Sequence, residues 1–137
     1  MSKRDIVVAD LVQLDETMIK TYSATAIQAF IRMMEKWNMS VIECCAILGG
    51  VPKQTYEKWV CNDVGRLSIE QLERISVLLG IYKTLKLLFC DEGGRQRWLK
   101  SPNHDYAFNG LSPAERLARG GIDDIYAVQR YVDGFCQ

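Results

Sequence analysis

The sequence predicts an all-α fold, and three observations lead to that prediction. Apolar residues recur at helical spacing, as Ile27, Phe30, Ile31 and Met34 do at i, i+3, i+4 and i+7. Ser-x-x-Glu or Ser-x-x-Gln patterns, which begin helices, occur at three places. No stretch of alternating apolar and polar residues bounded by turns indicates a β-strand.

The first segments alternate between helix signals and stop signals. Residues 1–22 mix charged and apolar side chains, and we expect an arm that is at most partly helical. A regular helical pattern begins at Ser23 and ends at Trp37-Asn38. Ser40 and Glu43 form a capping box that begins a short helix. Gly49-Gly50 ends this helix, because glycine tolerates the left-handed conformation of a tight turn.

The middle of the chain predicts three further helices. Pro52 is expected at the first helical position, where its missing N–H costs nothing, and the helix runs to about Val60. A second capping box, Ser68 to Gln71, begins a helix through Leu79. Gly80 predicts a break or kink before helical residues 81–89.

The last third predicts a helical hairpin after a short helix. Gly93-Gly94 is expected to precede a helix over residues 95–100, which Ser101-Pro102-Asn103 ends. Ser112-Pro113-Ala114-Glu115 combines an N-cap, a proline at the first helical position and a capping-box glutamate. Gly120-Gly121 ends that helix, and a final one covers residues 122–133.

The composition is that of an ordinary globular chain: 48% of the 137 residues are hydrophobic and 25% are charged. Lys plus Arg and Asp plus Glu number 17 each, so the formal net charge is zero. A uniformly basic nucleic-acid-binding surface is therefore excluded, and DNA contact would need a local patch. We find no secretory signal and no apolar stretch of the roughly 18 residues of a membrane helix. We expect a cytoplasmic protein without membrane association.

The five cysteines and the single histidine, His104, lack the spacing of a metal site. No two cysteines are in a Cys-x-x-Cys pattern, and a zinc site needs about four close Cys or His ligands. The chain also lacks a nucleophile motif and a phosphate-binding glycine loop. We therefore expect no catalytic residues, no metal and no cofactor. The cysteines are expected to be reduced, and at least one of Cys44 and Cys45 to face the core.

Residues 46–59 have the spacing of a DNA-reading helix pair. Ala46 is the small residue where two helices cross, Gly50 makes the turn, and Val51 follows it as an inward residue. Tyr56 and Trp59, three residues apart, are the inner anchors of the second helix. This stretch resembles the helix-turn-helix of Xre/Cro-type repressors, whose second helix enters the major groove.

The outer side of that second helix carries the candidate DNA-binding residues. Lysine can contact phosphate or guanine, and glutamine can pair with adenine. Glu57 on the same side repels phosphate, and the same geometry is also a compact way to pack three helices. The candidate DNA-binding residues are Lys53, Gln54, Thr55 and Lys58.

The C-terminal motifs resemble a second known unit. The motifs begin with Trp98-Leu99 and a Pro102-Asn103 turn. Residues 110–117 follow with the pattern Gly-x-Ser-Pro-x-Glu-x-Leu, and Gly120 closes the series. This order resembles the antitoxins of bacterial Xre–RES toxin–antitoxin pairs, the MbcA/ParS/Xre family. The resemblance covers roughly residues 23–134.

The resemblance implies an Xre/Cro-like helix-turn-helix bundle over residues 23–92 and a small helical toxin-binding module over residues 93–137, after the arm of residues 1–22. The first unit would form a homo-oligomer and bind operator DNA, and the second would cap a RES-domain toxin that consumes NAD or transfers its ADP-ribose. Aromatic and arginine side chains are common interface anchors. The candidate toxin contacts are Arg116, Arg119, Asp123, Asp124, Tyr126, Arg130 and Tyr131.

Two other hypotheses stay open from the sequence. The chain could be a stand-alone Xre-type transcriptional regulator whose C-terminal module serves dimerisation. It could also be a protein-only inhibitor whose helix-turn-helix no longer binds DNA. A gene for a RES-domain protein beside the gene for this chain would favour the antitoxin.

Overall fold

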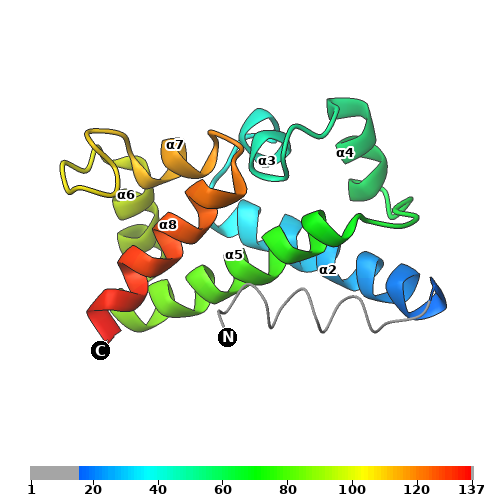
Figure 1. Ribbon diagram of the computed structural model, residues 1–137, viewed down its shortest axis with the longest axis horizontal. Coiled ribbons are helices and arrows are strands. Elements are labelled where there is room, and N and C mark those ends of the chain that lie inside the picture. Colours follow the sequence, from blue (N-terminus) through cyan, green and yellow to red (C-terminus); the bar gives the residue numbers. More distant parts are fainter. Residues whose placement is uncertain (1–15, 137) are drawn as a thin grey trace.

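The computed structural model describes residues 16–136, apart from the side chains of residues 16, 17 and 19. These residues form an all-α fold, which confirms the predicted fold class (Figure 1). Residues 16–22 of the predicted arm belong to the first described helix, and residues 1–15 lie outside the described part. The elements in chain order are α2 (Glu16–Lys36), α3 (Val41–Ile47), α4 (Lys53–Val60), α5 (Ile69–Leu88), α6 (Glu92–Lys100), α7 (Pro113–Leu117), α8 (Ile122–Asp133) and a 3-10 turn, η1 (Gly134–Cys136).

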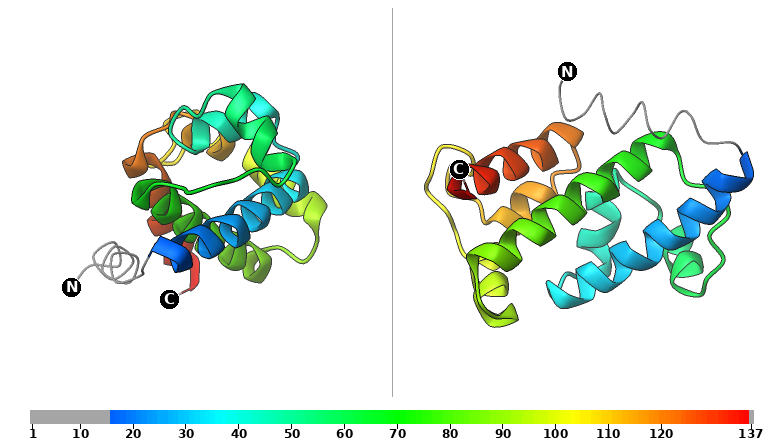
Figure 2. Two further views of the ribbon diagram at one scale, coloured as in Figure 1. Left: turned by 90° about the vertical axis from the view of Figure 1, so that its right-hand side faces the viewer. Right: turned by 90° about the horizontal axis from the view of Figure 1, so that it is seen from below.

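Helix α5 crosses the middle of the molecule. The view from below shows it between α2 on one side and α8 on the other, and it packs against both (Figure 2). Helices α3 and α7 lie over this layer, with α4 beyond α3 (Figure 1). None of the helices of residues 16–136 has the length and apolar character needed to cross a lipid bilayer.

The predicted capping boxes are all present. At Ser112, the hydroxyl accepts from the Glu115 N–H at 3.1 Å, and the Glu115 carboxylate accepts from the Ser112 N–H at 2.8 Å. Ser40 and Ser68 form the same reciprocal pairs with the residues three positions later. Each box satisfies two backbone donors that a helix start leaves free.

Gly80 does not break the helix, contrary to the sequence prediction, because α5 continues through it to Leu88. Glycine inside a helix costs about 1 kcal/mol relative to alanine. Val77, Leu78 and Ile81 are all buried around Gly80. Their burial, at about 25 cal/mol per Å² of apolar surface, outweighs that cost.

Three predicted helix starts are also wrong. The first helix of the described residues, α2, includes residues from Glu16 rather than beginning at Ser23, whose buried hydroxyl instead accepts from the Leu67 N–H at 3.0 Å. Pro52 is the N-cap of α4 rather than its first helical residue. Gly93 and Gly94 lie inside α6 because Asp91 caps it, with its carboxylate 2.7 Å from the Gly94 nitrogen.

The buried apolar side chains form one core that extends from α2 to α8. Tyr56 and Trp59 are buried in it, as predicted for the inner side of α4, and so are Cys44 and Cys45. Burial raises the pKa of both thiols, which keeps them protonated. The predicted units on either side of residues 92 and 93 share this core.

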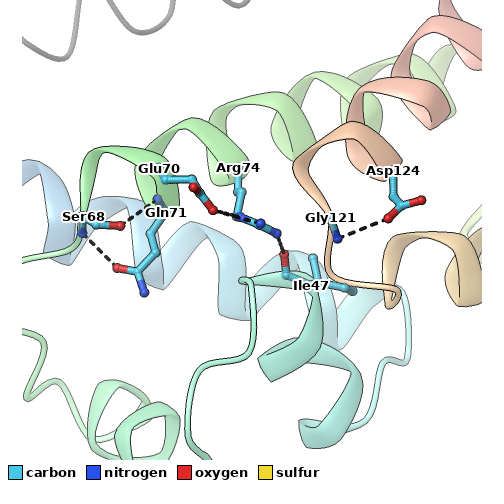
Figure 3. A network of polar contacts seen from close by, with 7 residues as sticks. All are labelled: Ile47, Ser68, Glu70, Gln71, Arg74, Gly121 and Asp124. Atoms are coloured by element: carbon cyan, nitrogen blue, oxygen red, sulfur yellow. Dashed lines mark hydrogen bonds and ion pairs between the residues drawn. The ribbon is translucent and has the colours of Figure 1, made fainter.

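A buried arginine joins α5 to the end of α3 (Figure 3). Arg74 is 4% exposed. Its Nη1 donates to the Ile47 carbonyl at 3.0 Å, and its Nη2 lies 2.9 Å from a Glu70 carboxylate oxygen. A cation at the C-terminal end of a helix is favoured by the helix dipole. Gly49, with φ +97°, leaves room for the guanidinium, since a Cβ there would lie 3.1 Å from its central carbon.

Gly120 provides a second close approach between the two predicted units. Its φ is +88°, and a Cβ built on it would lie 3.2 Å from the backbone oxygen of Ala46. Glycine therefore serves both the turn and the contact between the start of α8 and the end of α3.

Alanine substitutions at two glycines should change stability in opposite directions. Gly80→Ala places a methyl group 3.5 Å from the Gln129 amide, an ordinary contact, and should stabilise the protein by about 0.5–1 kcal/mol through helix propensity. Gly120→Ala should destabilise it by about 1–2 kcal/mol, because alanine is strained at positive φ. Urea unfolding measures both, and a loss of stability with Gly80→Ala would contradict the packing described for α5.

Candidate functional site

The predicted DNA-binding residues lie on the outer side of α4. Lys53, Gln54 and Lys58 are exposed and Thr55 is half-buried, whereas the two aromatic anchors of the helix face the core. The side chains predicted to read DNA are thus displayed together on one short helix.

One of the two lysine charges on this helix is already paired with a carboxylate of the same helix. Lys53 Nζ lies 3.9 Å from a Glu57 carboxylate oxygen, and the two side chains are 69% and 57% exposed. Such an exposed pair contributes little to stability, and either partner can be drawn away by another charge. Within residues 16–136, no ion pair involves Lys58.

The seven predicted toxin contacts fall into two groups. Three side chains are exposed to solvent: Arg119, Asp123 and Arg130. The other four are half-buried or buried and are held by contacts inside the molecule: Arg116, Asp124, Tyr126 and Tyr131. The surface they form is therefore built on an internal polar framework.

Arg116 and Asp124 tie α7 to the start of α8. The Arg116 Nε lies 2.6 Å from a carboxylate oxygen of Asp124, and its Nη1 donates to the Ala107 carbonyl at 2.5 Å. The other Asp124 oxygen accepts from the Gly121 N–H at 3.2 Å (Figure 3). Arg119 Nε is 3.8 Å from Asp124, at the exposed edge of this pair.

Tyr126 joins α8 to α5. Its hydroxyl donates to the carboxylate of Glu73 at 2.7 Å, and Glu73 is only 3% exposed. A buried carboxylate needs such a donor, because burial of an unsatisfied charge is costly. Tyr126 therefore positions α8 from within.

Tyr131 holds together an aromatic cluster near the C-terminal end of α8. Its ring centroid lies 4.8 Å from that of Phe108 and 5.2 Å from that of Phe135, both in edge-to-face geometry, and the ring stacks on Trp98. Edge-to-face and offset pairs add about 0.5–1.5 kcal/mol each beyond simple burial. We call Trp98, Tyr106, Phe108, Tyr131 and Phe135 the aromatic cluster.

The Tyr131 hydroxyl donates to the Asp105 carboxylate. Burial of the phenol and this hydrogen bond both raise the pKa of Tyr131. The bond connects α8 to the loop that follows α6.

Two members of the aromatic cluster, Tyr106 and Phe135, are 88% and 62% exposed. Sequence reasoning missed both as surface residues, because neither lies on a helix whose periodicity could orient it. The only available signal is their place among polar or glycine-flanked loop residues, where no core position is required. Trp98, which belongs to the C-terminal motifs, is half-buried.

The described residues include no cluster of three His, Cys, Asp or Glu side chains able to hold a metal ion.

Two comparisons with known proteins bear on this region. A family model described as the antitoxin Xre/MbcA/ParS C-terminal toxin-binding domain matches residues 84–135. A Sinorhizobium fredii protein named uncharacterized protein y4oB is 34% identical over 107 residues, which cover 78% of this chain and 81% of that protein. The matched range begins inside α5 and includes the whole aromatic cluster.

Tyr131→Phe should destabilise the protein by about 1 kcal/mol near pH 7, since it removes one partly buried hydrogen bond to a carboxylate. The folded-state pKa of Tyr131 is raised from 10.0. Its contribution is therefore complete below the pKa of the unfolded phenol and is lost as pH rises through the folded value. Thermal unfolding of the wild type and the variant from pH 7 to 11 checks this. Tyr106→Phe is the control, because Tyr106 is 88% exposed. Equal effects of the two variants at pH 7 would contradict the role of Asp105.

Proposed function

Because the chain belongs to the Xre/MbcA/ParS antitoxin family, we propose that it neutralises a RES-domain toxin that consumes NAD or transfers its ADP-ribose, and that it does so by capping the active site of that toxin. The match of residues 84–135 to the toxin-binding domain carries this proposal. In this role the chain acts by binding, in the cytoplasm, and needs no catalytic residue or cofactor of its own.

The proposed toxin contacts come from α7, α8 and the turn between them. Arg119, Asp123 and Arg130 would meet the toxin directly, because their side chains reach solvent. Arg116 and Asp124 would set the position of Arg119 through their shared ion pair. Tyr126 and Tyr131 would contribute by holding α8 in place.

We also propose that the protein represses its own operon through α4. Lys53 and Lys58 would contact phosphate, and Gln54 and Thr55 would lie at base edges. With a net charge of zero, one copy offers few phosphate contacts. A homo-oligomer would repeat these contacts along the operator, as two-fold repressors do.

Growth rescue tests the antitoxin proposal. The genes beside the gene for this chain are examined for a RES-domain protein, and the absence of one would count against the proposal. That protein is induced alone and together with the chain, and growth and cellular NAD are measured. Co-expression should restore both, and the two purified proteins should form a complex. Failure to restore growth and to form a complex would reject the proposal. Operator binding without complex formation would favour the stand-alone regulator.

Gel shifts with the promoter DNA of the same operon test the DNA proposal. The double variant Lys53→Ala with Lys58→Ala should bind DNA more weakly. The slope of log binding constant against log salt concentration should become shallower by about 2, since each phosphate contact contributes roughly 0.9. Lys83→Ala with Lys86→Ala is the matched control, because these two exposed lysines lie on α5. An unchanged shift in the α4 variant would remove α4 from the interface and favour a protein-only inhibitor.

A further inference from the structure

Residues from the ends of α5 and α8, from α6 and from η1 line an apolar groove. The ends of α5 and α8 and helix α6 lie at the left of Figure 1. It has a volume of about 220 Å³. An apolar cavity of about 150 Å³ is enough to admit benzene, so the groove has room for a bulky side chain. Its lining is entirely apolar or aromatic: Leu88, Phe89, Trp98, Val132 and Phe135.

One side chain of the groove lining is exposed, whereas Val132 at its base is fully buried. Phe135 is 62% exposed, although its ring also packs on Tyr131. Most large apolar side chains of the described chain are inside the core. An aromatic side chain left open beside an apolar hollow is typical of a contact surface rather than of free surface.

A second hollow of about 340 Å³ lies across the Phe89–Trp98 pair, and its lining is more polar. Arg97 lies in this lining, and among the described residues no ion pair involves it. A Cβ on Gly93 would lie 3.2 Å from Nη1 of Arg97, so glycine leaves space for the guanidinium. Arg97 lies outside the lining of the apolar groove, one residue before Trp98, which lines both hollows. An exposed guanidinium in this position is complementary to a carboxylate next to an apolar side chain.

The groove has a firm base. Trp98 stacks on Tyr131 with ring planes 17° apart and meets Phe108 edge to face with centroids 5.8 Å apart. The Phe89 carbonyl accepts from the Arg95 guanidinium at 3.2 Å. The Trp98 ring, which these ring contacts hold in place, loses little freedom when a partner binds, and this favours affinity.

We propose that this groove is a principal docking site for the toxin, with an apolar side chain of the toxin inserted between Phe89, Trp98 and Phe135 and a neighbouring toxin carboxylate paired with Arg97. This inference rests on the proposed function and adds to it residues outside the seven predicted contacts. The groove lies wholly within the residues that match the toxin-binding domain. That placement favours the toxin over a second copy of this chain as the occupant.

Binding measurements with the RES-domain protein that the growth-rescue experiment identifies test the inference. Phe135→Asp and Arg97→Glu should each weaken the complex at least about tenfold, as loss of an interface anchor does. Ile42→Asp is the matched control, because Ile42 is 78% exposed on α3, outside the toxin-binding match. Circular dichroism and thermal unfolding of each variant show whether it is folded.

Photo-crosslinking identifies the occupant directly. With p-benzoylphenylalanine at position 135 the adduct should contain the RES-domain protein, and with it at position 42 no such adduct should form. If the wild type binds and neutralises the toxin while Phe135→Asp does so equally well, the groove is not the docking site and the proposed function stands. An adduct of two copies of this chain would assign the groove to self-association and overturn the inference. If the wild type neither binds nor neutralises, both the function and the docking site are rejected.

Discussion

A buried cation joins the central helix α5 to the end of α3 and adds a polar contact to the apolar core that the helices share. Arg74 reaches from the central helix α5 to the last carbonyl of α3 and carries its counter-charge, Glu70, one turn away on α5 itself. The guanidinium thereby sets where α3 ends and where the glycine turn toward α4 begins. Helix α8 packs on the same helix α5. Helix α5 therefore positions α8 directly and α4 through α3.

Because of this arrangement, two separate surface regions of the molecule are built on a single core. The side of α4 predicted to meet DNA and the aromatic cluster at the end of α8 are far apart in sequence, yet each is anchored in the same core. Direct contacts strengthen the connection, since Gly120 meets the Ala46 backbone and Tyr126 binds Glu73 of α5. The two surfaces are therefore connected through packed helices rather than through a linker.

Local signals in the sequence predicted the helices well, and the errors came from long-range contacts. The capping boxes at Ser40, Ser68 and Ser112 depend only on residues three apart, and all three are present. The break expected at Gly80 is absent because burial against α8 outweighs a local preference. The apolar groove was not predicted, since Leu88, Trp98 and Phe135 line one hollow only when α5, α6 and η1 converge. For the same reason, sequence spacing did not reveal that Tyr126 and Tyr131 point inward.

The unbroken helix α5 also bears on how proteins of this kind can exchange partners during evolution. The matched toxin-binding residues begin at position 84, near the C-terminal end of α5 at Leu88, whereas earlier residues of this helix contact α2 and α3. A recombination point there would join two parts of one helix that come from different proteins. The buried side chains of each part must then pack against elements of the other parent. A viable chimera would instead need its crossover in the loop before Ser68, so that α5 travels with α6, α7 and α8. Inherited in this way, a new toxin specificity would bring its own Arg74 to an older α3.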